Sequence, residues 1–142
     1  MRDTSSSQLA LQNLIDCYLE TNPPEVLKAW ADNNWKVEKH EDIDEACMKY
    51  LALVLLDAIE SRAQKIILEK SCPVLIVSQN SQHLLPAASD SLLARGLEIV
   101  REICGMEGPE AEGVLSLGIR NDSLELKIKK SEAVHTIYLP AL

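Results

Sequence analysis

The chain has 142 residues, of which 46% are hydrophobic and 25% charged, a composition typical of a globular domain and unlike that of a disordered tail. Its formal net charge of −8 disfavours nucleic acids and acidic membrane surfaces as partners. The first ten residues lack the apolar segment of a secretory signal, and no apolar run approaches the ~20 residues that span a bilayer. We therefore expect a soluble, cytoplasmic protein without membrane insertion and without a nucleic-acid partner.

Residues 1–40 are predicted to form a helical appendage. Its first helix runs from about Gln8 to Glu20, because apolar residues recur at helical spacing after a run of three serines that can cap it. Two prolines end this helix, and Pro24 suits the first turn of a short second helix that reaches Trp30. The appendage is too small to bury a full core alone, so we expect a second unit, an α/β sandwich domain over residues 41–142.

A long helix is predicted over residues 42–62. Asp42 can cap it, with Glu45 three positions later, directly before the apolar run. The middle of this helix is apolar on nearly all sides, which predicts a central, buried element. Two short runs rich in β-forming residues follow, Lys65–Glu69 and Pro73–Val77, and they predict a β-hairpin.

Residues 78–88 are polar and are predicted as a loop with a short extended stretch at Leu84-Leu85. A second amphipathic helix spans about Ser89 to Cys104, and Gly105 supplies its C-terminal cap. Gly96 in the middle of this helix costs about 1 kcal/mol relative to alanine. Its presence indicates that another element packs closely at that point.

Three β-like runs complete the chain, Val114–Arg120, Leu124–Lys129 and His135–Leu139, with a turn at Asn121-Asp122 between the first two. The order of elements predicts an α+β fold. It consists of an N-terminal helical appendage, then a long helix, a β-hairpin, a helix and three antiparallel strands. The helices would pack on one antiparallel sheet of about five strands.

The four cysteines are separated by 30, 25 and 32 residues, too far apart for a zinc knuckle or a redox motif. They are Cys17, Cys47, Cys72 and Cys104. Three of them continue apolar helical patterns, and four in a chain of this length is not the density of a disulfide framework. We therefore expect thiols buried in the core.

No catalytic or nucleotide-binding motif is found, because the sequence has no phosphate-binding glycine loop, no HExxH, no GxSxG and no EF-hand spacing. The acidic cluster at residues 40–45 is interpreted as helix capping rather than a metal site. Cys72 or Cys104 beside His83 or His135 is the one nucleophilic pairing that the sequence leaves open. The prediction is a protein that is not an enzyme and holds neither metal nor cofactor.

Trp30 and Trp35 are the candidate interface residues. The chain has 4% aromatic residues and no phenylalanine, so two tryptophans five positions apart in the appendage are unusual. Tryptophan often anchors protein interfaces, and we predict that the exposed faces around these two residues contact a partner protein. The alternative is that they attach the appendage to the main domain.

The order of the predicted helices and strands is also similar to that of a known domain. The apolar helix ends at Leu55–Ala63 and leads into the strand Gln64–Glu69; the second helix has a comparable pattern over Leu92–Met106, and Gly113–Leu139 forms a glycine-led strand with two more. On these elements, residues 43–139 resemble the N-terminal α/β domain that precedes the motor domain of type II secretion and type IV pilus ATPases. The resemblance implies a stand-alone relative, a regulatory and protein-binding module of a bacterial secretion or pilus machine.

Where that family has arginines on the second strand that face nucleotide, this chain has Val74–Val77. An alternative is an acidic, dimeric protein similar to the chaperones of type III secretion, although those end in a helix and this chain ends in a β-like run. A small-ligand-binding domain is a further alternative. A homodimer is also expected as a possibility, because small α+β domains with long apolar helices often leave an exposed patch to cover.

Overall fold

Helix α3 (Ile43–Glu60) lies at the centre of the structure, a computed structural model that describes residues 4–37, 42–106, 112–119, 122–131 and 134–140. The helix begins where predicted, because the Asp42 carboxylate accepts a hydrogen bond of 2.8 Å from the Asp44 backbone N–H. Its residues from Ala46 to Ala58 are all buried except Lys49. The predicted central, buried helix is therefore confirmed.

Six strands of the described residues form one antiparallel sheet in the order β3-β2-β1-β6-β5-β4. Their bounds are β1 Lys65–Glu69, β2 Val74–Val77, β3 Gln82–Leu85, β4 Glu112–Ile119, β5 Asp122–Ser131 and β6 Val134–Tyr138. The sheet consists of two three-stranded meanders that join where β1 pairs with β6, with Leu68 opposite His135. The predicted hairpin and the three C-terminal strands are present, and the predicted α+β class is confirmed.

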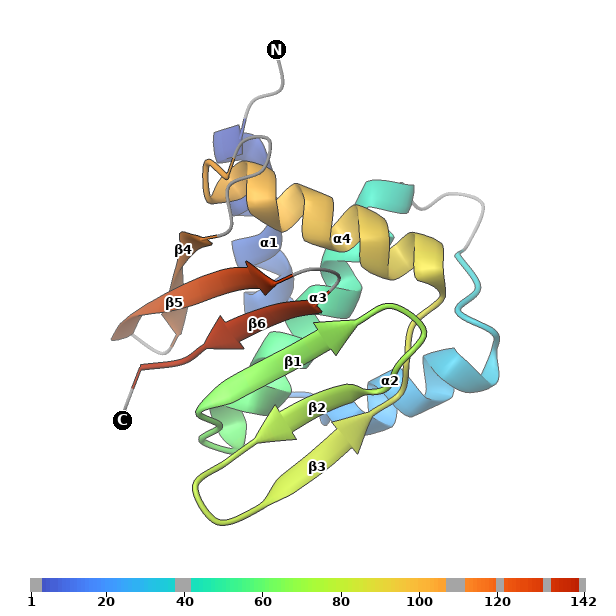
Figure 1. The fold of residues 1–142 in the computed structure, drawn as a ribbon. Coiled ribbons are helices and arrows are strands. Elements are labelled where there is room, and N and C mark those ends of the chain that lie inside the picture. Colours follow the sequence, from blue (N-terminus) through green and yellow to red (C-terminus); the bar gives the residue numbers. More distant parts are fainter. Residues whose placement is uncertain (1–3, 38–41, 107–111, 120–121, 132–133, 141–142) are drawn as a thin grey trace.

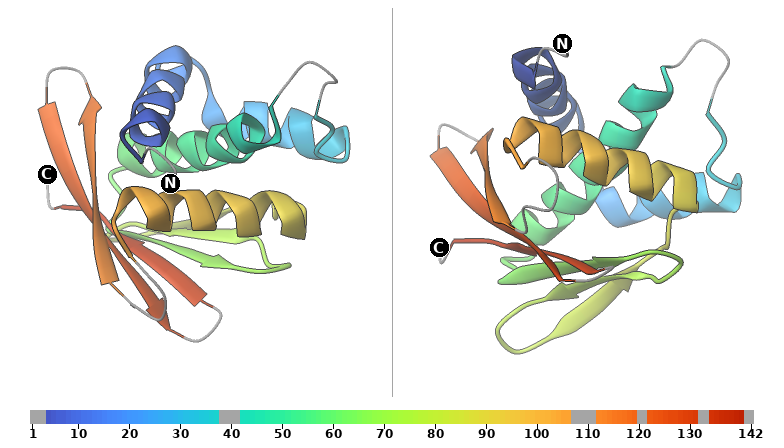
Figure 2. Two further views of the ribbon diagram at one scale, coloured as in Figure 1. Left: turned by 90° about the horizontal axis from the view of Figure 1, so that it is seen from above. Right: turned by 45° about the horizontal axis from the view of Figure 1, so that its top comes forward.

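The helices cover one face of the sheet and leave the other face uncovered (Figure 1). Helices α1 (Thr4–Tyr18), α2 (Pro23–Asp32) and α4 (Asp90–Ile103) all pack against α3, and Figure 2 shows α1, α3 and α4 on the same side of the strands. Leu11, Ile15 and Leu27 of the first two helices are fully buried in the same core as the sheet. The division of the chain at residue 40 stays a prediction; the described helices before that point share the core of the rest.

Strand β3 corrects the prediction of a loop over residues 78–88. It pairs with β2 over four residues, and it brings the sheet to six strands. The short extended stretch expected at Leu84-Leu85 is its second half. The polar residues that masked the strand are explained by His83, whose ring faces α3 and meets the carboxylate of Asp57 there, while Leu84 faces outward and is 62% exposed.

The cysteines need a second correction, because only Cys47 is buried. Cys104 is half-buried, whereas Cys17 and Cys72 are exposed, and all four are free thiols. Burial raises the pKa of the Cys104 thiol to about 11, and it also raises the pKa of Cys47. The prediction of core thiols therefore fails for Cys17, which lies in an open cleft between α1 and the start of α3, and for Cys72 in the β1–β2 turn.

Gly96 marks the place where α4 crosses α3. A Cβ atom added there would lie 3.0 Å from the Leu51 Cδ1 atom and 3.2 Å from the Cys47 carbonyl oxygen. The close approach predicted from the glycine is confirmed. Gly105 ends α4 with a φ of 71°, the left-handed conformation expected of a cap. None of the described helices is long and apolar enough to cross a membrane.

We predict that Gly96→Val destabilises the protein by roughly 1–3 kcal/mol, because the added methyl groups would overpack the crossing against backbone as well as side chain. Ala94→Val on the same helix is the matched control, since Ala94 is exposed, and it should cost only about 0.5 kcal/mol. Urea unfolding followed by circular dichroism measures both. Equal losses for the two variants would contradict the close crossing.

Candidate functional site

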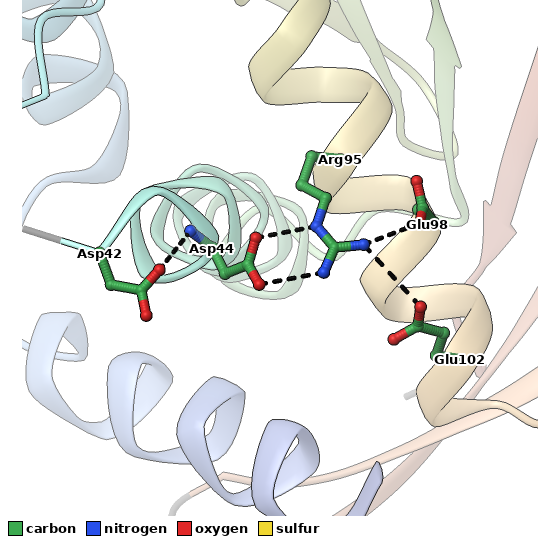
Figure 3. Close-up of polar contacts among 5 residues, drawn as sticks. All are labelled: Asp42, Asp44, Arg95, Glu98 and Glu102. Carbon is green, nitrogen blue, oxygen red and sulfur yellow. Dashed lines mark hydrogen bonds and ion pairs between the residues drawn. The ribbon is translucent and has the colours of Figure 1, made fainter. Parts of the chain in front are cut away.

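A polar clamp joins the first turn of α3 to α4. The Arg95 guanidinium makes two hydrogen bonds to Asp44, from Nε to Oδ1 at 2.8 Å and from Nη2 to Oδ2 at 3.0 Å. Its Nη1 atom lies 2.8 Å from Glu98 Oε1 and 3.8 Å from Glu102 Oε1 (Figure 3). The bond to Asp44 and the nearby carboxylates raise the pKa of Arg95, which stays charged.

This clamp accounts for part of the acidic cluster at residues 40–45. Asp42 caps α3, as predicted, and Asp44 holds Arg95. His40 and Glu41 lie outside the described residues. In the part of the chain that the structure describes, no group of three or more His, Cys, Asp or Glu side chains is placed to hold a metal ion.

The two predicted interface residues, one in α2 and one just after it, pack against each other and against α3. Trp30 and Trp35 meet edge to face with ring centroids 5.2 Å apart, and Trp35 meets Tyr50 of α3 in the same way at 5.4 Å. The indole Nε1 of Trp30 donates a 2.9 Å hydrogen bond to the Lys36 carbonyl oxygen, and Lys49 Nζ lies 4.8 Å from the Trp30 ring centroid. Trp30 is only 9% exposed, and Trp35 is half-buried.

This packing is the arrangement expected if the tryptophans attach the N-terminal helices to the main body. A backbone turn with Asn34 and Trp35 both in the left-handed region, at φ 57° and 58°, brings the Trp35 ring back onto α3. A contact between the remaining exposed part of Trp35 and a partner stays a prediction.

The two histidines of the described residues have different surroundings, and no contact between either of them and a cysteine is found among the described residues. His83 Nε2 lies 2.6 Å from Asp57 Oδ2, and this contact ties β3 to α3. His135 in β6 is 8% exposed, and among the described residues neither of its ring nitrogens has a hydrogen-bond partner. The signal for its inward direction is present in the sequence, because His135 and Ile137 are two positions apart in one strand and therefore share a face.

A cleft of about 350 Å³ opens between α4 and the part of the sheet where Lys130 of β5 pairs with His135 of β6. We call it the α4 cleft. Leu93, Ala94 and Leu97 line it from the helix, and Lys130 and His135 line it from the sheet. Burial, together with the positive charges of Lys130 and Arg101, lowers the pKa of His135, so the ring is neutral at pH 7.

The uncovered face of the sheet carries an apolar surface, which we call the outer patch. Its members point away from the helices because they alternate along the strands with fully buried residues. They are Ile67, Leu75, Val77, Leu84 and Tyr138. Cross-strand pairing places Ile67 beside Leu75 and Leu75 beside Leu84, so these three side chains form one continuous row.

The signal for the outer patch is present in the sequence. In β2 all four residues, Val74–Val77, are apolar, and an antiparallel strand with one solvated face should alternate with polar residues instead. Comparison of the sequence with models of known protein families gives no match, and no curated protein matches it.

We predict that Trp30→Ala destabilises the protein by about 3–5 kcal/mol, as expected for removal of a buried tryptophan. Trp35→Ala should cost less, because Trp35 is half-buried. Thermal unfolding measures both variants. A Trp30→Ala protein that keeps its wild-type stability would contradict a core role and would favour the interface prediction.

The lowered pKa of His135 predicts a stability that falls as the pH drops. The unfolded ring takes up a proton as the pH passes below about 6.5, whereas the folded ring resists protonation until a lower pH. The free energy of unfolding therefore falls over that window. His135→Gln should flatten this dependence. The difference in stability between the variant and wild type should therefore shift in favour of the variant when the pH is lowered from 8 to 5. Parallel curves for the two proteins would show that His135 does not titrate in this way.

Proposed function

We propose that this protein is a non-enzymatic protein-binding module that holds an extended segment of another protein against its outer patch. The single observation that carries the proposal is the exposure of Leu84 in β3, at 62%, and of Tyr138 in β6, at 39%, on the face that no helix covers. Apolar side chains that gather on an exposed face mark a protein-interaction site more often than an ordinary surface.

The two edges of the sheet favour an extended segment bound at β3. At the opposite edge, the Gln12 side chain of α1 occupies the hydrogen-bonding positions of one residue of β4, Gly118. It donates to the Gly118 carbonyl oxygen at 2.7 Å and accepts from the Gly118 N–H at 2.8 Å. Among the described strands none pairs with the outer side of β3. A segment that adds to β3 would gain backbone hydrogen bonds and would place its side chains beside Leu84.

Charge favours a partner segment with basic residues. The chain has a net charge of −8, so a basic segment is attracted at long range, whereas a second copy of this chain is repelled. On the outer face itself, Glu69 of β1 is exposed two residues from Ile67. Lys65 at the other end of β1 pairs with Val77 and with Tyr138. The proposed occupant is therefore a segment with apolar residues that places its lysine or arginine toward Glu69 and away from Lys65.

The resemblance to the N-terminal domain of secretion and pilus ATPases adds a finer proposal, that the partner belongs to such a machine. This part rests on the resemblance of residues 43–139 alone. A homodimer that covers the outer patch is the competing arrangement, and it is one of the outcomes that the experiment separates.

We predict that Leu84→Glu weakens partner binding at least tenfold, equivalent to about 1.4 kcal/mol, because it places a charge in the row of apolar side chains. Leu9→Glu on α1 is the matched control, since Leu9 is 61% exposed and lies away from the sheet face. It should bind as wild type does. Both variants should unfold at the wild-type temperature, because both side chains are exposed.

The partner is first captured with a photo-crosslinking residue placed at Gln82, an exposed position of β3, in cytosol of the native host. The crosslinked peptide is identified by mass spectrometry, and its affinity for the two variants is measured by calorimetry. A basic, apolar segment whose binding is lost only in Leu84→Glu supports the proposal. A crosslink to the chain itself, or equal losses in the two variants, contradicts it.

A further inference from the structure

We propose that the α4 cleft binds a small organic acid, with its carboxylate between Lys130 and His135 and its apolar body on the Leu93–Leu97 stripe of α4. This inference is independent of the outer patch, because the cleft lies on the helix-covered side of the sheet.

The α4 cleft contains a buried imidazole, that of His135. His135 faces the helix side and lines the cleft, although it is only 8% exposed. Among the described residues both ring nitrogens lack a hydrogen-bond partner, and each has less than 1 Å² of accessible surface. A buried polar group in that condition destabilises the folded state. With a small rotation of the ring toward the cleft, the ring N–H would donate a hydrogen bond to a carboxylate oxygen, and this cost would be offset on binding.

Charged side chains of both signs line the α4 cleft. Among the described residues, the basic side chains of the lining are Lys70, Arg101 and Lys130, and the acidic ones are Asp90 and Glu98. The acidic groups already have partners, since Ser71 Oγ donates to Asp90 Oδ1 at 2.9 Å and Glu98 accepts from Arg95 at 2.8 Å. Arg101 also has an interaction of its own, so Lys70 and Lys130 are the cations that the proposal uses. With His135 neutral, the formal charges of these described side chains sum to +1. A monoanion balances it, whereas a dianion such as a phosphate ester would leave an excess of negative charge.

Apolar side chains of α4 form one wall of the cleft. Leu93, Ala94 and Leu97 lie at helical spacing along one side of the cleft and offer no hydrogen bond to a ligand from their side chains. An inorganic anion leaves this wall uncovered, while the hydrocarbon part of an organic acid covers it. The volume of about 350 Å³ is at the lower end of the range of small-molecule sites. The ligand class is therefore a small aromatic or aliphatic monocarboxylate.

The experiment uses the full chain and three probes, namely benzoate, its neutral analogue benzyl alcohol, and inorganic phosphate. Binding is followed by NMR on protein labelled in the histidine rings, with the His135 signals assigned from the His135→Gln variant. We expect benzoate to shift the His135 ring signals in a saturable manner and to raise the pKa of this ring, because the bound carboxylate stabilises its protonated form. Benzyl alcohol and phosphate should leave these signals unchanged.

Lys130→Gln should weaken benzoate binding at least fivefold. Lys127→Gln is the matched control, because it removes the same charge from the same strand at an exposed position on the other face, and it should leave the affinity unchanged. Benzoate that does not shift the His135 signals, or that binds both lysine variants equally, overturns the proposal. Phosphate binding in place of benzoate overturns it as well. Leu84→Glu should bind benzoate as wild type does, so failure at the cleft and failure at the outer patch are distinguishable.

Discussion

Helix α3 has to be covered on nearly every side, because twelve of its eighteen residues are buried. No single neighbour can do this. The first two helices cover one side, α4 crosses it at Gly96, and the inner face of the sheet covers the rest. The Arg95–Asp44 clamp and the Trp30–Trp35–Tyr50 contacts fix two of these neighbours onto the same helix. The burial of the apolar side chains of α3 therefore accounts for the positions of the other described helices, which all pack against it.

This arrangement also explains why the molecule has two different candidate surfaces. Because every described helix is drawn to α3, none remains for the opposite face of the sheet, and the apolar side chains there stay accessible. On the covered side, α4 packs on α3, and the α4 cleft lies between its residues Leu93, Ala94 and Leu97 and the side chains of Lys130 and His135.

Much of the fold is predictable from the sequence, because local signals and burial agree for most elements. Asp42 starts α3, Gly105 ends α4, and Gly96 indicates the crossing before any coordinates are known. Strand β3 is not predictable, since one of its two inward residues is His83, and the partner of His83, Asp57, is distant in sequence. The direction of His135 follows from its alternation with Ile137, whereas its burial depends on α4. The outer patch is predictable from the four apolar residues of β2, because a strand with one solvated face would alternate with polar residues.

The side chain of Gln12 has a consequence for the stoichiometry of any complex formed by strand addition. By bonding to both backbone groups of Gly118, it blocks strand addition at that residue of β4, whereas no described strand pairs with the outer side of β3. A sheet with two open edges can extend copy after copy into a fibre, and closing part of one edge works against this. If a segment adds to β3 as proposed, helix α1 therefore favours a one-to-one complex over a polymer.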